Sequence, residues 1–145
     1  MSVREKYRGR PPLPPDWRER LEGLADVGAS HGVDLLYVFG SAARPGSETP
    51  EDVDLAYLPG PAFRFEAFYA DISRLLRTDR VDLVDLSQAS PFVAFEAVRT
   101  GRLLYRRSVD VENTFELSVL ARYRDAVVRL RHLERKRREL AGGRA

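Results

Sequence analysis

The sequence predicts an α/β (α+β) fold, in which a small mixed β-sheet is flanked by helices on one side and followed by a long C-terminal helix. Three observations support this expectation. Short runs rich in β-forming residues alternate with amphipathic stretches of helical spacing. From Val111 to Leu133 the apolar residues form one helical stripe. A chain of 145 residues, 43% of them hydrophobic and 32% charged, suits one globular domain.

The chain begins with a segment, residues 1–15, that we expect to be a flexible, basic and proline-rich arm. Its composition is too polar, and its prolines interrupt it too often, for it to build a core. A first helix is expected near residues 16–30, because Asp16 and Glu19 have the spacing of a capping box. Gly32 should end this helix.

The middle of the chain alternates between strand and helix patterns. Residues 33–39 are rich in β-formers and predict a buried strand, while residues 52–58 alternate acidic and apolar side chains with the period of a strand. The remaining expected elements are a helix at 61–77, a strand at 81–86, a short helix at 91–100 and an edge strand at 103–105. Together with the first helix they make one domain over residues 16–108.

The last part of the chain, residues 109–145, is expected to be an amphipathic helix with a basic tail. Residues 121–145 hold nine Arg or Lys against three acids, so they carry +6, and the rest carries −4 of the overall +2. A helix that is longer than the sheet it can cover should bury its stripe against another chain. We expect a partner protein or a second copy of this chain to contact the stripe residues Val119, Tyr123, Val127 and Leu130.

Composition excludes several classes of protein. Cysteine is absent, which excludes disulfide frameworks, cysteine zinc sites and thiol nucleophiles. The two histidines, His31 and His132, are too few for a histidine-rich metal site. No 18 apolar residues follow one another, so we expect a cytoplasmic protein without a membrane partner. Direct nucleic-acid binding is not expected either, because the basic residues gather at the C-terminal end.

One group of residues has the pattern of a site that binds phosphate and a cation. Gly40 and Ser41 follow the first strand, where a glycine lets the backbone turn and the free amides of a helix start favour anions. Ten residues separate Ser41 from Asp52, and Asp54 lies two residues farther along, so both carboxylates emerge on one face of a strand. Adjacent carboxylates repel each other unless a cation lies between them. Mg²⁺ is the natural candidate, because it prefers oxygen ligands and often binds substrate phosphates as well.

The third strand offers a further acid, either Asp82 or Asp85. These residues are three apart and face opposite sides of the sheet, so only one of them can join the other carboxylates. We expect Asp82, because Asp85 lies next to the turn at residues 87–89, where it is solvated more easily. Three carboxylates on adjacent strands can hold two metal ions roughly 4 Å apart.

With these residues in place, the sequence resembles the DNA polymerase β-type nucleotidyltransferase superfamily, whose motif is Gly-Ser, ten residues and Asp-x-Asp, followed by a third acidic strand. Residues 81–105 contain Val-Asp-Leu-Val-Asp-Leu and Phe-Glu-Ala-Val-Arg-Thr-Gly-Arg-Leu-Leu-Tyr, and are similar to the minimal nucleotidyltransferase (MNT) antitoxins of MNT–HEPN toxin–antitoxin systems. The resemblance covers about residues 20–125. It implies the nucleotidyltransferase fold and transfer of AMP from ATP to a hydroxyl, with pyrophosphate as the leaving group.

The resemblance also implies roles for the site residues. Gly40 and Ser41 would bind the β- and γ-phosphates of ATP. Asp52 and Asp54 would bind both Mg²⁺ ions, while Asp82 would bind one of them and act as the base toward the acceptor hydroxyl.

Arg44 has two open interpretations. It either contacts a phosphate or pairs with Glu48 or Glu51. The sequence departs from the family at this point, since Pro45 and Gly46 follow Arg44 where the family commonly has Gly directly after Arg. The departure bears on the role of Arg44 but not on the metal site.

The resemblance finally implies a partner. In the MNT antitoxins the acceptor is a tyrosine of the HEPN toxin, a ribonuclease that the added nucleotides silence, so a HEPN-type toxin is the expected partner and this chain the expected antitoxin. Two alternatives stay open: an antitoxin that blocks its partner by binding alone, and a nucleotidyltransferase that modifies a small hydroxylated molecule. The intact Ser41, Asp52 and Asp54 speak against the first, because a pure binder has no reason to keep facing carboxylates. The small chain speaks against the second, because it leaves little room for an acceptor-binding domain.

Overall fold

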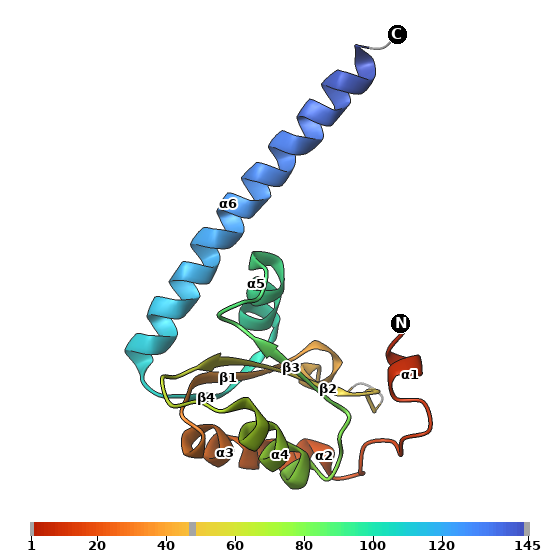
Figure 1. Ribbon diagram of the computed structural model, residues 1–145, viewed down its shortest axis with the longest axis vertical. Coiled ribbons are helices and arrows are strands. Elements are labelled where there is room, and N and C mark those ends of the chain that lie inside the picture. Colours follow the sequence, from red (N-terminus) through yellow and green to blue (C-terminus); the bar gives the residue numbers. More distant parts are fainter. Residues whose placement is uncertain (1, 47–48, 144–145) are drawn as a thin grey trace.

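A mixed four-stranded β-sheet lies at the centre of the computed structural model, which describes residues 2–46 and 49–143 (Figure 1). Its strands are β1 (Val33–Phe39), β2 (Val53–Pro59), β3 (Val81–Asp85) and β4 (Arg102–Arg106), in the order β3-β2-β1-β4. β1 pairs antiparallel with β2 and β4, whereas β2 and β3 are parallel. The predicted α/β fold with a small mixed sheet is confirmed, and β4 is an edge strand as expected.

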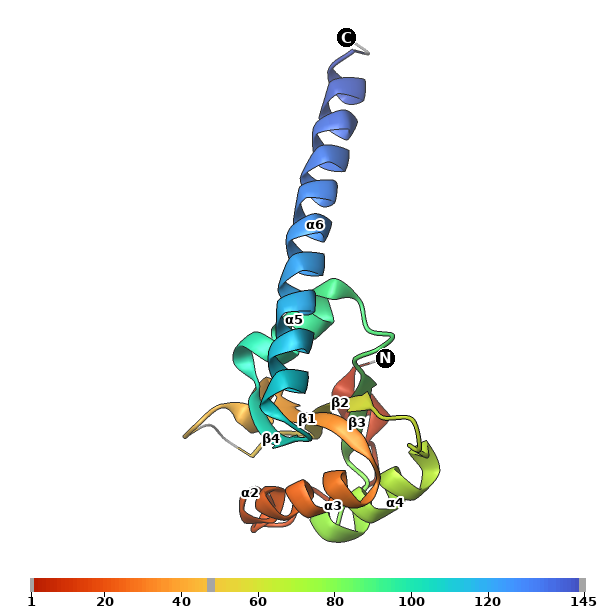
Figure 2. The same cartoon turned by 90° about the vertical axis from the view of Figure 1, so that its left-hand side faces the viewer.

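Helices cover both faces of the sheet, so the expectation of helices on one side is wrong (Figures 1 and 2). One face carries α2 (Trp17–Arg20), η1 (Leu21–Gly23), α3 (Leu24–Ser30) and α4 (Phe65–Leu76), and the other carries α5 (Pro91–Thr100) and α6 (Val109–Gly142). The reason lies in β1, which is apolar on both sides. Leu36 and Val38 belong to the first core, and Leu35 and Tyr37 to the second. Each apolar face of a strand needs a layer that excludes water.

Two helix starts differ from the prediction. The helix expected at 16–30 is divided into α2, η1 and α3, and no capping box forms, because the Asp16 carboxylate accepts a hydrogen bond from Arg20 Nε at 2.8 Å. The helix expected from residue 61 begins only at Phe65, and residues 61–64 form a turn and an extended segment.

The N-terminal segment contributes to the core, contrary to the expectation for residues 1–15. A short helix, α1 (Val3–Lys6), leads into Tyr7, which is only 2% exposed, and Leu13 packs against Trp17 in the first core. Isolated apolar residues in a polar segment carry no periodic signal, which is why composition alone gave the wrong expectation. The division of the chain into an arm, a domain and a C-terminal helix stays a prediction.

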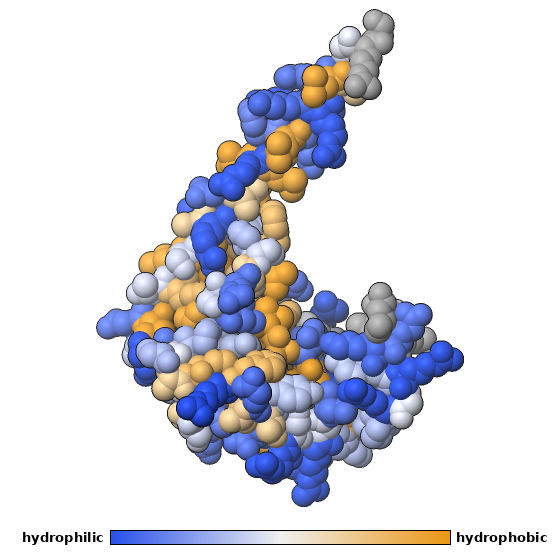
Figure 3. Space-filling view, in the orientation of Figure 1, coloured by the Kyte–Doolittle hydropathy of each residue, from blue (hydrophilic) through white to orange (hydrophobic). Residues whose placement is uncertain are grey.

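The C-terminal helix α6 extends far beyond the sheet (Figure 1). Its 34 residues span about 50 Å at 1.5 Å per residue. The first half packs on α5, where Val119 is 1% exposed and the ring of Tyr123 stacks on Phe95 with 3.7 Å between centroids. Val119 is therefore covered within its own chain, and its expected role at a partner interface is wrong. Beyond this point Leu130 is 46% exposed, and Figure 3 shows apolar side chains among charged ones along the outer half of the helix.

None of the helices within the described ranges combines the length and the apolar character needed to span a bilayer.

Candidate active site

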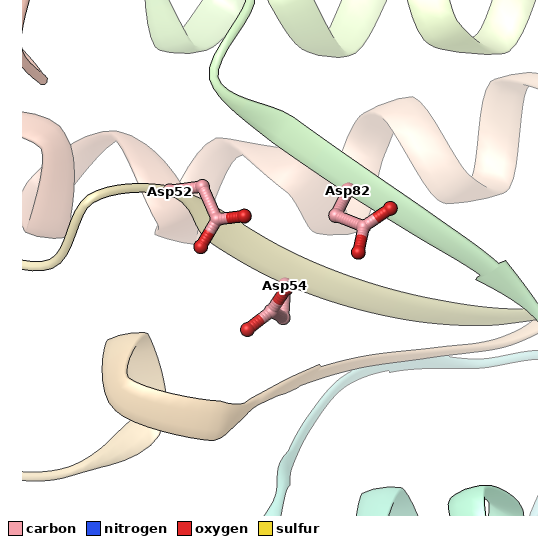
Figure 4. A group of neighbouring side chains, drawn as sticks. All are labelled: Asp52, Asp54 and Asp82. Atoms are coloured by element: carbon pink, nitrogen blue, oxygen red, sulfur yellow. The ribbon is translucent and has the colours of Figure 1, made fainter. Parts of the chain in front are cut away.

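Three carboxylates meet at one end of the sheet, on the face that α5 covers (Figure 4). Asp54 lies in β2, and Asp52 immediately precedes this strand, so the two side chains emerge on the same face. In the parallel pairing of β2 and β3, Asp82 stands opposite Asp54. One oxygen from each of the three residues lies within 4.8 Å of the other two. Backbone register alone is therefore sufficient to bring these acids together.

Asp85 lies on the other face of β3, as its spacing from Asp82 requires. Its carboxylate accepts hydrogen bonds from the backbone amide and the hydroxyl of Ser87, at 2.9 and 2.6 Å. Asp85 thus stabilises the turn after β3, and the structure places Asp82, not Asp85, beside Asp52 and Asp54.

The Gly40–Ser41 turn directly adjoins the carboxylates. Gly40 opens the short 3₁₀ helix η2 (Gly40–Ala43) with a φ of +66°, a conformation that favours glycine. A Cβ atom at this position would lie 2.5 Å from Asp54 Oδ2. The contact follows from the sheet, since Phe39, the residue before Gly40, pairs with Asp54 across β1 and β2. Ser41, half-buried, is the next residue of the turn.

The electrostatics of the cluster favour a cation. Burial, and then the charges of Asp52 and Asp82, raise the pKa of Asp54 to about 7. Burial and the charge of Asp82 also raise the pKa of Asp52, which is 8% exposed, while Lys6 and Tyr7 oppose this rise. Holding these carboxylates together in their charged form therefore costs free energy that a bound cation would offset.

The donor set fits Mg²⁺. It consists of carboxylate oxygens, the hard ligands that this ion prefers, and no histidine or cysteine takes part. Three carboxylates from two strands leave coordination positions for the phosphate oxygens of a substrate.

Arg44 ends η2 and is exposed. Of its two predicted carboxylate partners, Glu48 lies outside the described residues, and the side chain of Glu51 accepts a hydrogen bond from Arg80 Nη1 at 3.2 Å. A phosphate contact of Arg44 stays a prediction.

Three residues beside the carboxylates carry no signal in the sequence. Lys6 Nζ lies 3.7 Å from Asp82 Oδ1, and Tyr7 is buried next to Asp52. Arg80, 8% exposed, precedes β3 and binds the backbone of the N-terminal segment. Only the tertiary structure brings residues 6 and 7 to the site, because some 45 residues separate them from Asp52 along the chain.

Comparison with solved structures finds chains of the same fold. A structure of tri-AMPylated Shewanella oneidensis HEPN toxin in complex with MNT antitoxin contains a chain that is 21% identical, with a TM-score of 0.57 over 87% of this chain and 96% of that one. A toxin–antitoxin structure with AMP-PNP gives 22% identity and a TM-score of 0.60, over 86% and 95% of the two chains. A structure of the toxin–antitoxin pair MntA–HepT gives 21% and 0.57, over 86% and 96%.

Sequence comparisons identify the family of this chain. Curated proteins give no match. The sequence profile of the family described as "Polymerase beta, Nucleotidyltransferase" matches residues 22–110, which include β1 to β4 and all three carboxylates. The chain therefore belongs to the polymerase β-type nucleotidyltransferases.

Proposed function

We propose that this nucleotidyltransferase transfers AMP from ATP to a tyrosine hydroxyl of a HEPN-type ribonuclease toxin and so acts as its antitoxin. The observation that carries the proposal is the contact between the Gly40 turn and the carboxylates, because it joins a phosphate-binding element to a cation site. The fold shared with chains from MNT–HEPN complexes supports the choice of partner and acceptor.

Each residue of the site has a part in this reaction. Asp52 and Asp54 hold two Mg²⁺ ions, and Asp82 holds one of them. When bound, the ions neutralise the triphosphate and align the acceptor oxygen with the bond that breaks. The amide and hydroxyl of Ser41, with the Gly40 backbone, bind the β- and γ-phosphates. Arg44 extends from η2 as a further phosphate contact.

Asp82 has the additional role of base. It accepts the proton of the acceptor hydroxyl while this oxygen forms a bond to the α-phosphorus of ATP. The bond from that phosphorus to the β-phosphate oxygen breaks, and pyrophosphate leaves with the electron pair. The exposed side of Asp82, 47% accessible, leaves room for an acceptor to approach.

The direct test is the double variant Asp52→Asn with Asp54→Asn. An amide supplies no charge to offset Mg²⁺, so transfer should fall by at least roughly a thousandfold, the size of losses when transition-state charge stabilisation is removed. The measurement is the mass of a HEPN-type toxin that co-purifies with this chain, after incubation with Mg²⁺ and ATP. Asp85→Asn is the matched control, since it changes an acid of the same sheet outside the cluster and should retain transfer.

The same experiment separates the alternatives. Full transfer by the double variant would refute the proposed chemistry. Neutralisation of the toxin by wild-type chain without ATP would instead favour an antitoxin that acts by binding alone.

A further inference from the structure

Asp52 is the carboxylate of the cluster that strand pairing does not fix. The pairing of β2 with β3 begins at Val53, and its pairing with β1 begins at Asp54. Asp52 lies in the segment before β2, yet it is only 8% exposed. A site residue keeps one orientation when hydrogen bonds hold the groups around it. Contacts other than the strand ladder must therefore hold the segment that carries Asp52.

Arg80 binds the chain on both sides of Asp52. The backbone carbonyl of Arg80 accepts a hydrogen bond from the amide of Val53 at 2.9 Å. Its guanidinium Nη1 donates to the backbone carbonyl of Glu51 at 3.1 Å and to the Glu51 carboxylate at 3.2 Å. The residue before Asp52 and the residue after it are thus both hydrogen-bonded to Arg80.

The place of Arg80 in the sheet explains these contacts. Val53 pairs with Val81 in the parallel ladder, and Asp52 and Arg80 are the residues that immediately precede this pair. Asp82 follows two residues after Arg80, on β3, and Figure 4 shows it across from the start of β2. Arg80 therefore joins the segment that carries Asp52 to the strand that carries Asp82.

The guanidinium of Arg80 is itself held in place by the N-terminal segment. Its Nε donates to the carbonyl of Pro11 at 2.6 Å, and its Nη2 donates to the carbonyls of Arg10 at 2.7 Å and Tyr7 at 3.4 Å. Arg80 is 8% exposed, and its guanidinium carbon lies 5.4 Å from the centroid of the Tyr7 ring. The donors of a guanidinium point in fixed directions within one plane, so bonds on several of its sides hold the group firmly. A lysine ammonium lacks this geometry and cannot keep all of these bonds.

We propose that Arg80 is a positioning residue of the metal site, which holds Asp52 where its carboxylate can share a cation with Asp82. The inference rests on the proposed function in one respect, since that function makes Asp52 a metal ligand. Arg80 acts through Asp52 and not on the reacting atoms, because its guanidinium donates to carbonyls and to the Glu51 carboxylate. Residues that orient a metal ligand contribute about ten- to hundredfold to metal affinity.

Arg20 offers a matched control, since it makes similar bonds away from the carboxylates. Its Nε donates to the Asp16 carboxylate at 2.8 Å and its Nη1 to the Leu75 carbonyl at 3.1 Å, which joins α2 to α4. These helices lie on the face of the sheet opposite the carboxylates. Arg20→Lys should therefore lower the free energy of unfolding, as should Arg80→Lys, but leave cation binding unchanged.

The test is a double-mutant cycle on the binding of Mg²⁺ to the full-length chain, measured by calorimetry with the α,β-methylene analogue of ATP present. Arg80→Lys should weaken Mg²⁺ binding by about tenfold or more. When Asp52→Asn is already in place, the same substitution should change the affinity by less than about twofold, because the ligand that Arg80 positions is lost. A residue that acted only on the fold would weaken binding by the same factor in both backgrounds.

Electron paramagnetic resonance supplies a second readout, with a saturating concentration of Mn²⁺, which prefers the same oxygen ligands as Mg²⁺. Arg80→Lys should give the spectrum of Asp52→Asn, and both should differ from the wild type, because each loses the Asp52 carboxylate from the ion. Circular dichroism checks that every variant is folded. If Arg80→Lys is not, trimethylamine N-oxide is added to all the proteins at the concentration that restores its spectrum, since this osmolyte favours the compact state.

The outcomes separate this inference from the proposed function. A folded Arg80→Lys variant with the Mg²⁺ affinity and the Mn²⁺ spectrum of the wild type overturns the inference and leaves the proposed function intact. An equal loss of affinity in the two backgrounds, or an equal loss in Arg20→Lys, also overturns it. A wild-type chain that binds no Mg²⁺ with the analogue contradicts the proposed function itself.

Discussion

A single glycine couples the turn after β1 to the carboxylates that we propose hold the metal. Gly40→Ala introduces two separate penalties, a left-handed backbone, which costs an alanine about 1–2 kcal/mol, and a Cβ atom 2.5 Å from Asp54 Oδ2. The Asp54 carboxylate has to move away from the cluster to relieve the contact. We expect binding of Mg²⁺ with the ATP analogue to weaken by roughly tenfold or more, which corresponds to about 1.4 kcal/mol, measured by calorimetry.

Gly32→Ala supplies a control for the backbone penalty. Gly32 has a similar φ of +71°, and a Cβ atom there would have no neighbour within 4 Å. Both variants should lose the free energy that a left-handed alanine costs, but only Gly40→Ala should also lose affinity for the nucleotide. Equal affinities of the two variants would contradict the role given to the turn.

The raised pKa of Asp54 predicts how stability depends on pH. Its ordinary value is 3.8, and in the folded chain it is about 7. Between these values the folded state holds a proton that the unfolded state has released, so the free energy of unfolding of the metal-free chain falls as pH rises through this window and stays low above it. Mg²⁺ binds the deprotonated form, so it should stabilise the chain more at pH 8 than at pH 5, as thermal unfolding followed by circular dichroism would measure.

Asp54→Asn should remove most of this pH dependence, because the amide does not titrate. Asp85→Asn should retain it, since Asp85 lies on the opposite face of β3. Stability of the metal-free wild type that rises with pH between about 5 and 7 would show that the carboxylates are not held together in their charged form.

At the scale of elements, the local sequence pattern was sufficient to predict the sheet and to predict which three acids lie together. The period of two residues in β2 and the spacing of three between Asp82 and Asp85 fix which side chains share a face, and pairing in register then aligns Asp54 with Asp82. Contacts between segments that are distant in the sequence could not be predicted from local pattern. The segment that carries Lys6 and Tyr7 is bound through its backbone carbonyls by Arg80. Every residue has such a carbonyl, so the sequence of the segment does not reveal this contact.

The limit of local pattern also explains two wrong predictions about the helices, namely the face of the sheet that they cover and the part of α6 that is exposed. Both apolar faces of β1 are visible in its sequence, but the helix that covers each face depends on chain crossings that no local pattern specifies. The stripe of α6 continues without a break, so its sequence does not show where contact with α5 ends and the exposed part begins.

At the scale of the whole molecule, the outer half of α6 is the surface on which we expect assembly. Leu130 and Leu133 are 46% and 55% exposed, and Leu140 near the end of the helix is 73% exposed. Basic residues surround them, among them Arg135 to Arg138, so a partner that covers this surface should combine apolar and acidic side chains. Either a HEPN-type toxin or a second copy of this chain is the expected occupant.

Leu130→Asn combined with Leu133→Asn tests this expectation. The substitutions lie beyond the contact of α6 with α5, so each should cost below about 1 kcal/mol of stability. His132→Asn combined with Arg135→Asn, on the opposite side of the helix at 100° per residue, is the control. Light scattering after size-exclusion chromatography, of the chain alone and with its co-expressed partner, should show a smaller particle for the leucine variant only. An unchanged mass for the leucine variant would show that this half of α6 is not an interface, because replacing two central leucines by amides removes the apolar area on which binding there depends.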